Sequence, residues 1–345
     1  MYANKTFQKF CRERNVKEST KNGYESALKN YTQYHQLTLN ELLDEATTDE
    51  ERNIPLKNRK IKKRLINYRS YLLKSKSSPN TVRTYFTKVK TFYKHFGIEL
   101  PSLPDAKYNT IYETNYLDLP TKKHIRQAVE MVGVDLRAVI LFMSSSGTAK
   151  AETLSLTVEQ FIEGCSDYHD GGSLELILNT LEHKRNIVPT IYLRRIKTDK
   201  YYYTFCSPEA SHEIVKYLKT RPNLKLDDKL FDFSASTLLA RFQEINDSMG
   251  WGFKGKYRFF RSHTLRKFHA SNIGLSAEYI DELQGRSKTM VHATYIKPNP
   301  DALKKIYKSA MKNVMIGEVE TPDVQHQEFT IVINIFLSGK EYNIF

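Results

Sequence analysis

The chain has 345 residues, enough for two domains that each bury a hydrophobic core. Its hydrophobic fraction of 40% and charged fraction of 27% are those of a globular protein, and no apolar run approaches the roughly 20 residues that span a bilayer. The first five residues lack the apolar core of an export signal, so we expect a cytoplasmic protein. The formal net charge of +14 points to a polyanionic partner once its distribution is considered.

The positive charge is concentrated in the N-terminal part. Residues 1–100 contain 21 Lys and Arg against 10 Asp and Glu, whereas the rest contains 32 against 29. The stretch from Arg52 to Ile98 has 14 basic residues and no acidic one. A solvated helix face normally mixes both signs, so this stretch is typical of a surface that binds nucleic acid. A basic surface that only aids solubility is the alternative, and a membrane surface is disfavoured by the aromatic apolar faces.

Residues 1–100 have the pattern of amphipathic helices. Ser19 and Thr20 precede an apolar set that recurs at spacings of three and four from Tyr24 to Tyr34. Residues 61–74 repeat this pattern, and a third helix is predicted between Pro79 and Gly97. We therefore expect residues 1–100 to form a helical DNA-binding domain.

The outward faces of the second and third helices supply the residues that we expect to contact DNA. On the third helix these residues recur at i, i+4, i+7 and i+11, so they form one stripe. They would mainly position phosphates rather than read bases. The candidate DNA-binding residues are Arg83, Thr87, Lys90 and Lys94 on the third helix and Lys62 and Lys63 on the second.

Pro101 and Pro104 interrupt the helical pattern, so residues 101–118 are predicted to be a linker before a domain at 119–315. Helices are expected in this domain at 122–132, 136–144, 151–156 and from 208–219 to about 312. Alternating runs at 174–178, 188–195 and 201–206 predict strands. The fold class is therefore mostly α with a small antiparallel β-sheet.

Several common motifs are missing. The sequence contains no GxxxxGK[ST], HExxH or GxSxG pattern, so P-loop, zinc-protease and serine-hydrolase chemistry have no support. Cys11, Cys165 and Cys206 lie far apart without CxxC spacing, which argues against a disulfide framework or a zinc module.

A set of polar residues in the last third of the chain indicates phosphate chemistry. His263 and Arg266 are three residues apart, so on a helix both could bind one phosphate. Arg286 follows in a Gly-Arg-Ser segment, and Tyr295 comes nine residues later. The order and spacing of these residues make the signal specific, because each alone occurs often by chance.

These motifs resemble the tyrosine recombinase family of phage integrases, Xer proteins and Cre, in an archaeal-type form, over residues 5–312. His263 and Arg266 match the family's H-x-x-R box, and Tyr295 matches its nucleophile. Arg286 stands where the family commonly has His or Trp, and arginine can still donate to a phosphate. The resemblance implies a two-domain architecture, with a helical core-binding domain before a mixed α/β catalytic domain.

The family also has a lysine on a β-hairpin. Residues 194–200 lie at the turn between the second and third predicted strands, which would place a lysine amine at the tip of the sheet. Lys197 matches the family's lysine, with Lys200 as the alternative.

One family residue is absent. Residues 146–156 align without gaps to the family's T-G-L-R-x-x-E-L-L-x-L, and Ala149 occupies the position of its first catalytic arginine. Lys150 is the nearest basic residue, one position on and about 100° further round a helix. Lys150 is therefore a candidate substitute; the alternatives are a weakened enzyme or a locally different alignment.

The resemblance implies a chemistry that these residues can perform. Arg266, His263 and Arg286 would neutralise the non-bridging phosphate oxygens, and Tyr295 would attack to form a 3′-phosphotyrosyl bond. Lys197 would donate a proton to the departing 5′ oxygen. This chemistry needs no metal or cofactor.

The segment 316–345 differs from the rest of the chain. Its pattern predicts a strand at 328–337, a turn at 338–340 and a short strand at 341–345. An isolated hairpin is marginally stable, so we expect it to join a sheet, on a neighbouring protomer for example. The resemblance implies such exchange within a tetramer on DNA; a partly ordered tail is the alternative.

Three functions remain open. The first is a site-specific recombinase or integrase that acts on double-stranded DNA, carried by a virus or mobile element and associated with the nucleoid of a prokaryotic host. The second is a type IB topoisomerase, which uses similar chemistry. The third is a DNA-binding relative with lost or weakened catalysis, for which Ala149 is the evidence.

Overall fold

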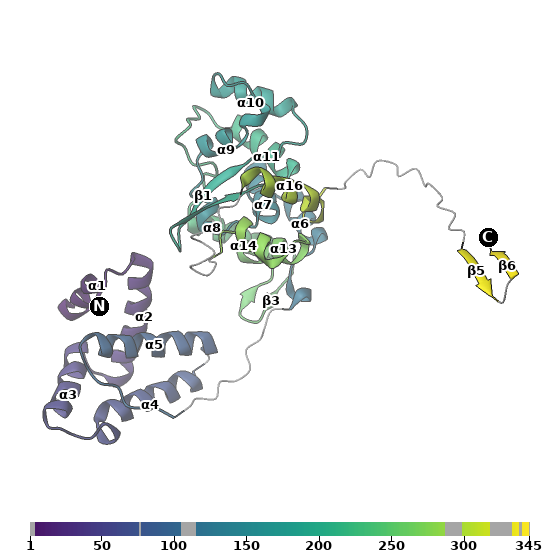
Figure 1. Cartoon of the computed structure of the whole chain (residues 1–345). Coiled ribbons are helices and arrows are strands. Elements are labelled where there is room, and N and C mark those ends of the chain that lie inside the picture. The colour runs from purple at the N-terminus through teal and green to yellow at the C-terminus, as the bar shows by residue number, and fades with distance from the viewer. Residues whose placement is uncertain are drawn as a thin grey trace. The chain divides into compact units, whose positions relative to one another are not determined.

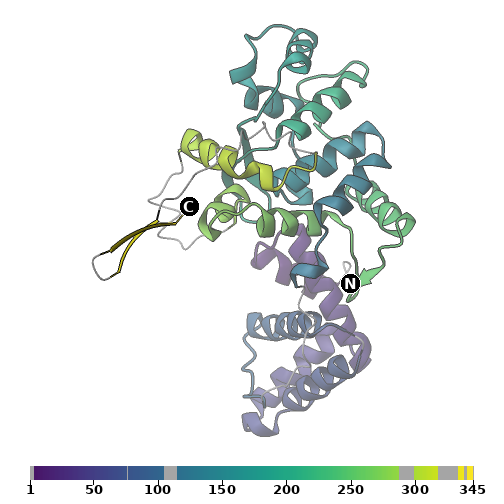
Figure 2. The same cartoon turned by 90° about the vertical axis from the view of Figure 1, so that its right-hand side faces the viewer.

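The computed structural model describes residues 4–75, 77–104, 115–286, 299–317, 333–337 and 340–344. The chain divides into two compact units, Met1–Glu113 and Thr114–Phe345. In Figure 1 and Figure 2 the purple-to-blue helices gather in the first unit and the teal-to-green elements in the second. None of the helices in the described ranges combines the length and apolarity needed to cross a bilayer.

The first unit is helical. It contains α1 (Lys5–Glu13), α2 (Glu18–His35), α3 (Leu39–Glu51), the short helix η1 (Leu56–Asn58), α4 (Lys60–Lys74) and α5 (Pro79–His95). Its core is rich in aromatic residues. Tyr31, Tyr68, Phe92 and Tyr93, which the apolar faces predicted, are almost fully buried, and Phe10 of α1 joins them.

The predicted ends of these helices are partly right. At the start of α5 the Ser78 hydroxyl accepts the N–H of Thr81 and Pro79 occupies the first turn, while Gly97 follows the helix with a φ of +80°. The start predicted for the first helix is wrong by two residues. Because α2 begins at Glu18, Ser19 lies inside the helix and caps nothing.

The second unit is built around α7, in which Leu136 and every residue from Ala138 to Ser146 are buried. The helices α11 and α13 pack against it. The helices before the hairpin are α6 (Lys122–Glu130), α7 (Val134–Ser146), α8 (Lys150–Thr153), α9 (Val158–Gly164) and α10 (Leu174–His183), with η2 (Tyr116–Asp118) and η3 (Ser166–Tyr168). The later helices are α11 (Pro208–Lys219), α12 (Ala235–Ser248), α13 (Ser262–Asn272), α14 (Ala277–Leu283) and α16 (Pro300–Ala310), with η4 (Met311–Asn313).

The strands of the second unit form two-stranded antiparallel pairs. Strands β1 (Ile191–Arg195) and β2 (Lys200–Thr204) pair from Ile191 with Thr204 to Arg195 with Lys200. A smaller pair, β3 (Phe253–Lys254) and β4 (Tyr257–Arg258), was not predicted. The expected fold class, mostly α with a small antiparallel sheet, is confirmed.

The strand predicted at 174–178 is wrong. This segment opens α10, where the Ser173 hydroxyl accepts the N–H of Leu176 and caps the helix. Ile177, Leu178 and Leu181 are buried at helical spacing. The alternating apolar residues at its start gave a strand pattern, and the helical period only appears when Leu181 is included.

The chain after α16 is fixed to the second unit as far as Gly317. The Glu209 carboxylate accepts the backbone N–H groups of Ile316 and Gly317, each at 2.7 Å, and the Arg126 guanidinium donates to the Ile316 carbonyl. Near the C-terminus β5 (Ile333–Leu337) and β6 (Lys340–Ile344) pair antiparallel.

Candidate nucleic-acid interface and phosphate site

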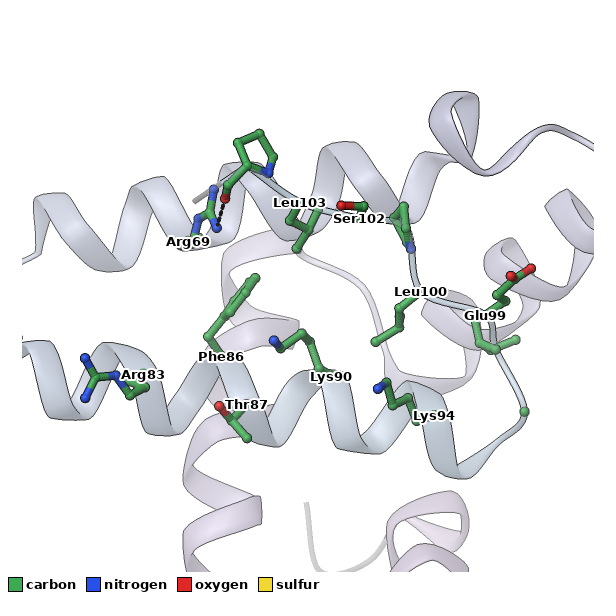
Figure 3. A pocket seen from close by; sticks show the side chains of 14 residues that line it. Arg69, Arg83, Phe86, Thr87, Lys90, Lys94, Glu99, Leu100, Ser102 and Leu103 are labelled. Atoms are coloured by element: carbon green, nitrogen blue, oxygen red, sulfur yellow. Dashed lines mark hydrogen bonds between the residues drawn. The ribbon is translucent and has the colours of Figure 1, made fainter. Parts of the chain in front are cut away.

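The first candidate site is a groove of about 1100 Å³ on the first unit, which we call the basic groove. The α5 stripe forms one side and Arg69 of α4 the other, while the segment after Gly97 closes the end (Figure 3). Its side-chain lining includes the four α5 residues that the sequence singled out. The residues that line it are Arg69, Arg83, Phe86, Thr87, Lys90, Lys94 and 97–104.

An aromatic ring lies under the cations of the basic groove. The Arg69 guanidinium and the Lys90 ammonium lie 5.6 and 5.1 Å from the centroid of the Phe86 ring. Arg69 also donates to the Pro104 carbonyl at 2.7 Å (Figure 3). Among the described lining residues Glu99 is the one carboxylate, so the groove has a positive surface suited to a phosphate backbone.

Not all of the basic run contributes to this surface. Arg59 forms an ion pair with Glu50 at 2.7 Å, and Arg64 donates to both carboxylate oxygens of Glu45. The acidic helix α3 therefore compensates the N-terminal half of α4. The sequence run contains no acid, but the fold brings acids to it from α3.

Lys62 and Lys63, also predicted to contact DNA, do not line the basic groove. Lys62 lies two turns before Arg69 on the same face of α4 and is half-buried, while exposed Lys63 points about 100° away. Arg69 was missing from the predicted contacts, although its spacing of seven residues from Lys62 would have placed it on the Lys62 face.

The second candidate site lies in the second unit around Arg266 of α13. Arg266 is 7% exposed and donates to the Gly147 carbonyl at 2.6 Å and to the Gln284 carbonyl at 2.9 Å. Arg195, at the end of β1, donates to the Gln284 and Gly285 carbonyls at 2.8 and 2.7 Å. Elements far apart in the sequence therefore meet here. We call Arg195, Arg266 and Arg286 the arginine cluster.

Two glycines allow this convergence. Gly147 has a φ of +66°, and a Cβ there would lie 2.6 Å from both His269 Nδ1 and the Gln284 amide nitrogen. Gly285 has a φ of +58°, and a Cβ there would lie 2.5 Å from the Tyr202 ring. Any side chain at either position would be strained and would separate the backbone from Arg266 or Arg195.

The arginine cluster carries excess positive charge. Burial lowers the pKa of Arg266 to about 10; Tyr202 and Glu152 oppose this shift, while the cations Arg195 and Arg286 add to it. Arg266 stays protonated at neutral pH. Glu152 is 3% exposed and accepts the backbone N–H of Ala149 at 2.9 Å, so its charge is fixed beside the cluster.

His263 and Arg286 lie at the exposed side of the second site. Desolvation lowers the pKa of His263, and the cations Arg261, Lys267, Arg266 and Arg286 lower it further, so the imidazole is neutral near pH 7. The Arg286 guanidinium lies 3.4 Å from the Asp281 carboxylate. Arg266 and Arg286 lie close enough for their charges to interact, and the charge of Arg286 also reaches His263.

The predicted lysines lie in different places. Lys197 is exposed in the turn between β1 and β2, as expected, and Arg194 and Asp199 close that turn with an ion pair. The Lys150 ammonium donates to the Ala235 carbonyl at 3.3 Å, at the start of α12. Tyr295 lies outside the described residues, so its position relative to the cluster is a prediction. Among the described residues no group of three or more His, Cys, Asp and Glu could hold a metal ion.

Arg195 was missed by the sequence reasoning. The alternation of buried residues along β1, with Ile191 and Leu193 inward, places Arg195 on the same side of the strand. That alternation is the signal in the sequence that identifies Arg195.

Comparisons with known proteins support this fold. No protein-family model matches the chain, and no curated protein matches its sequence. Among solved structures, a lambda integrase (75–356) dimer bound to a COC′ core site has 13% identity and a TM-score of 0.54, covering 85% of this chain and 97% of that chain.

Two further structures are similar. A lambda integrase tetramer bound to a Holliday junction has 14% identity and a TM-score of 0.53, covering 83% of this chain and 74% of that one. The Tn1549 transposon integrase in complex with transposon right end DNA has 14% identity and a TM-score of 0.50, covering 88% and 98%. The chain therefore has the fold of the tyrosine recombinases, as its motifs predicted, and these identities establish the fold alone.

Proposed function

We propose that the chain is a site-specific DNA recombinase that cuts and rejoins double-stranded DNA through a 3′-phosphotyrosyl bond to Tyr295. The observation that carries this proposal is the arginine cluster. Arg266 is buried, charged and held by two backbone carbonyls, beside Arg195 and within electrostatic reach of Arg286. Such an arrangement is costly without an anion, and a phosphodiester supplies one.

The cleavage step follows from the roles of the side chains. Arg266 and Arg286 neutralise the non-bridging oxygens, which lowers the repulsion that the attacking oxygen meets. The Tyr295 oxygen forms a bond to phosphorus while the bond from phosphorus to the 5′ oxygen breaks. The Tyr295 proton passes to neutral His263, and Lys197 gives a proton to the departing 5′ oxygen.

Rejoining is the reverse of this step. A 5′ hydroxyl from a second DNA end attacks the phosphotyrosine, Tyr295 leaves, and the two protons return. The bond energy of the phosphodiester is conserved in the phosphotyrosine, so the exchange needs no energy source. The reaction sequence requires no metal or cofactor.

The basic groove supplies the affinity for DNA in this proposal. Arg83, Thr87, Lys90 and Lys94 contact phosphates along one strand, with Lys62 and Lys63 extending the surface on α4. Four copies act together on two duplexes, as in the lambda integrase tetramer on a Holliday junction. The hairpin of β5 and β6 is the proposed contact between protomers.

One experiment tests the chemistry. The full-length protein is incubated with a pool of nicked duplexes that have a randomised central segment, so that cleavage next to the nick releases a short strand and traps the protein on DNA. We expect a covalent adduct that survives denaturation, and sequencing of the trapped DNA identifies the preferred site. Tyr295→Phe should bind the same DNA with unchanged affinity and form no adduct, because only the hydroxyl is removed.

The outcomes separate the competing functions. Adduct formation by Tyr295→Phe would overturn the nucleophile assignment. Adducts without sequence preference, with relaxation of supercoiled DNA by a monomer, would favour a type IB topoisomerase. Binding without any adduct would favour a relative that has lost cleavage, which the alanine at position 149 makes the second candidate.

A further inference from the structure

The position of Ala149 leaves the phosphate site one arginine short of the pattern that its motifs resemble, and Arg195 lies beside Arg266. Arg195 and Arg266 both donate to the Gln284 carbonyl, at 2.8 and 2.9 Å. Two donors on one oxygen lie within about 6 Å of each other. A phosphate that contacts Arg266 is therefore within reach of Arg195.

Buried polar atoms without partners surround these two arginines. Within the described part of the chain, four such atoms belong to residues at this site: Arg195 Nε, the Tyr202 hydroxyl, His269 Nε2 and Gln284 Oε1. Arg195 Nε and the Tyr202 hydroxyl are donors, and the Tyr202 oxygen lies close enough to Arg195 and Arg266 to feel their charges. A buried donor without an acceptor is costly, so this pair fits an oxyanion.

The charge balance favours the same ligand. The charged side chains that act on Arg266 are those of Arg195, Arg286 and Glu152, and Arg286 also faces the Asp281 carboxylate. One positive charge is left over, which equals the charge of one phosphodiester.

We infer that Arg195 is a catalytic residue whose guanidinium contacts the scissile phosphate and supplies the charge missing at Ala149. This inference rests on the proposed recombinase function. The guanidinium comes from β1 rather than from the start of α8, so the same charge reaches the site from a different element. The Tyr202 hydroxyl, which stays protonated because burial raises its pKa, lies close to both guanidinium groups.

A purely structural role for Arg195 is the competing explanation, since its Nη1 ties β1 to the Gly285 turn. The two explanations differ in what an anion does. A structural arginine does not respond to phosphate, and its loss is not repaired by changing the charge of the DNA.

The first test does not depend on cleavage. The full-length protein, with ¹⁵N-labelled arginine, is titrated with inorganic phosphate while the side-chain N–H signals are recorded, and Arg195→Lys and Arg266→Lys identify the two signals. We expect both signals to shift with one dissociation constant. The signal of Arg241, which is paired with Glu244 on the outer face of α12, should stay in place. An unmoved Arg195 signal overturns the inference, whether or not Arg266 responds.

The second test uses the trapped adduct. Arg195→Ala should slow adduct formation by about 10²–10³-fold on ordinary DNA. It should recover at least tenfold on a substrate with a neutral methylphosphonate at the cleaved position, because that substrate lacks the charge that Arg195 neutralises. Arg241→Ala is the matched control and should behave as the wild type on both substrates.

Loss without methylphosphonate rescue would assign Arg195 a structural role and overturn the inference. If the wild-type protein forms no adduct on any DNA, the recombinase proposal fails, and the phosphate titration still decides whether Arg195 and Arg266 share an anion.

Discussion

The basic groove and the arginine cluster both concentrate positive charge, but in different ways. In the basic groove Arg69 and Lys90 lie over the Phe86 ring, and Lys94 is exposed on α5. In the cluster Arg266 is 7% exposed and fixed by hydrogen bonds to two carbonyls. Exposed lysines and arginines keep their hydration and rotamer freedom, whereas a buried guanidinium has lost both before a ligand arrives.

This difference predicts a division of labour. Flexible, hydrated cations attract any phosphate backbone and give affinity that depends on salt. A fixed, dehydrated cation adds little affinity for the ground state but stabilises charge that develops in a transition state at a defined point. The two surfaces should therefore respond oppositely to substitution, one in binding and the other in rate.

The largest effect is expected at Arg266. Arg266→Lys should lower the rate of adduct formation by about 10²–10³-fold at saturating DNA. The lysine ammonium lacks the planar fork of donors with which the guanidinium can bind both carbonyls and a phosphate. The affinity for DNA should change by less than about threefold. Quench-flow trapping gives the rate and a mobility-shift titration the affinity. Thermal unfolding of the variant, beside Arg241→Ala, shows whether the fold persists.

An equal loss of affinity in Arg266→Lys would contradict the division of labour.

The second prediction concerns the basic groove. The double variant Lys90→Gln/Lys94→Gln should weaken DNA binding and reduce the slope of log affinity against log salt by about 2, because each phosphate contact contributes roughly 0.9. Its cleavage rate at saturating DNA should stay near that of the wild type. Lys9→Gln, an exposed lysine on α1 with a carboxylate partner in Glu13, is the control.

Lys62→Gln/Lys63→Gln, measured beside this pair, tests how far the surface extends along α4. An unchanged salt slope in the Lys90/Lys94 variant would place the DNA elsewhere on the chain.

The third prediction compares the two units in acid. His269 is fully buried beside the arginine cluster, and burial first, with Arg266 and Arg286, lowers its pKa to about 3. In the unfolded chain His269 binds a proton below about pH 6.5, whereas in the folded chain it stays neutral until the pH approaches 3. Stability of the second unit should therefore fall by about 1.4 kcal/mol per pH unit between pH 6 and pH 4 and level off near pH 3.

Urea unfolding at a series of pH values measures this slope. In the wild type the Gln284 amide donates to His269 Nδ1. His269→Gln keeps an acceptor for this amide but does not titrate, so it should flatten the dependence of stability on pH. In the first unit half-buried His35 has a pKa lowered to about 4, so its contribution to the pH dependence should level off earlier, near pH 4. A slope that persists in His269→Gln would assign the acid sensitivity to other groups.

Local signals predicted much of the fold. The cap at Ser78, the proline at the start of α5 and the glycine after it fixed that helix, and α11 has the bounds that its pattern gave. The pattern failed where it was short. The five alternating residues that open α10 gave a strand pattern, and the four residues of β3 and β4 are too few to show a period.

The residues of the two candidate sites could likewise be predicted only where the signal lies within one element. Spacing along one helix identified the α5 stripe, and the H-x-x-R spacing identified Arg266, because both are properties of a single element. Arg195 reaches Arg266 only through a carbonyl 89 residues later in the chain, and such a contact has no local signature. The compensation of Arg64 by Glu45 was likewise invisible, since the acid lies outside the basic run.

The smallest effect is expected at Lys150. Its ammonium donates to the Ala235 carbonyl, and its position at the start of α8 gives it no contact with the arginine cluster among the described hydrogen bonds. Lys150→Ala should therefore change the rate of adduct formation by less than about threefold, as expected for a surface substitution.

Ala149→Arg should add little if Arg195 already supplies the second guanidinium. In an Arg195→Ala background it should restore most of the rate, because either arginine then completes the site. A nearly silent Lys150→Ala would instead identify Lys150 as the substitute, and a large gain from Ala149→Arg alone would identify a weakened enzyme whose second guanidinium is missing.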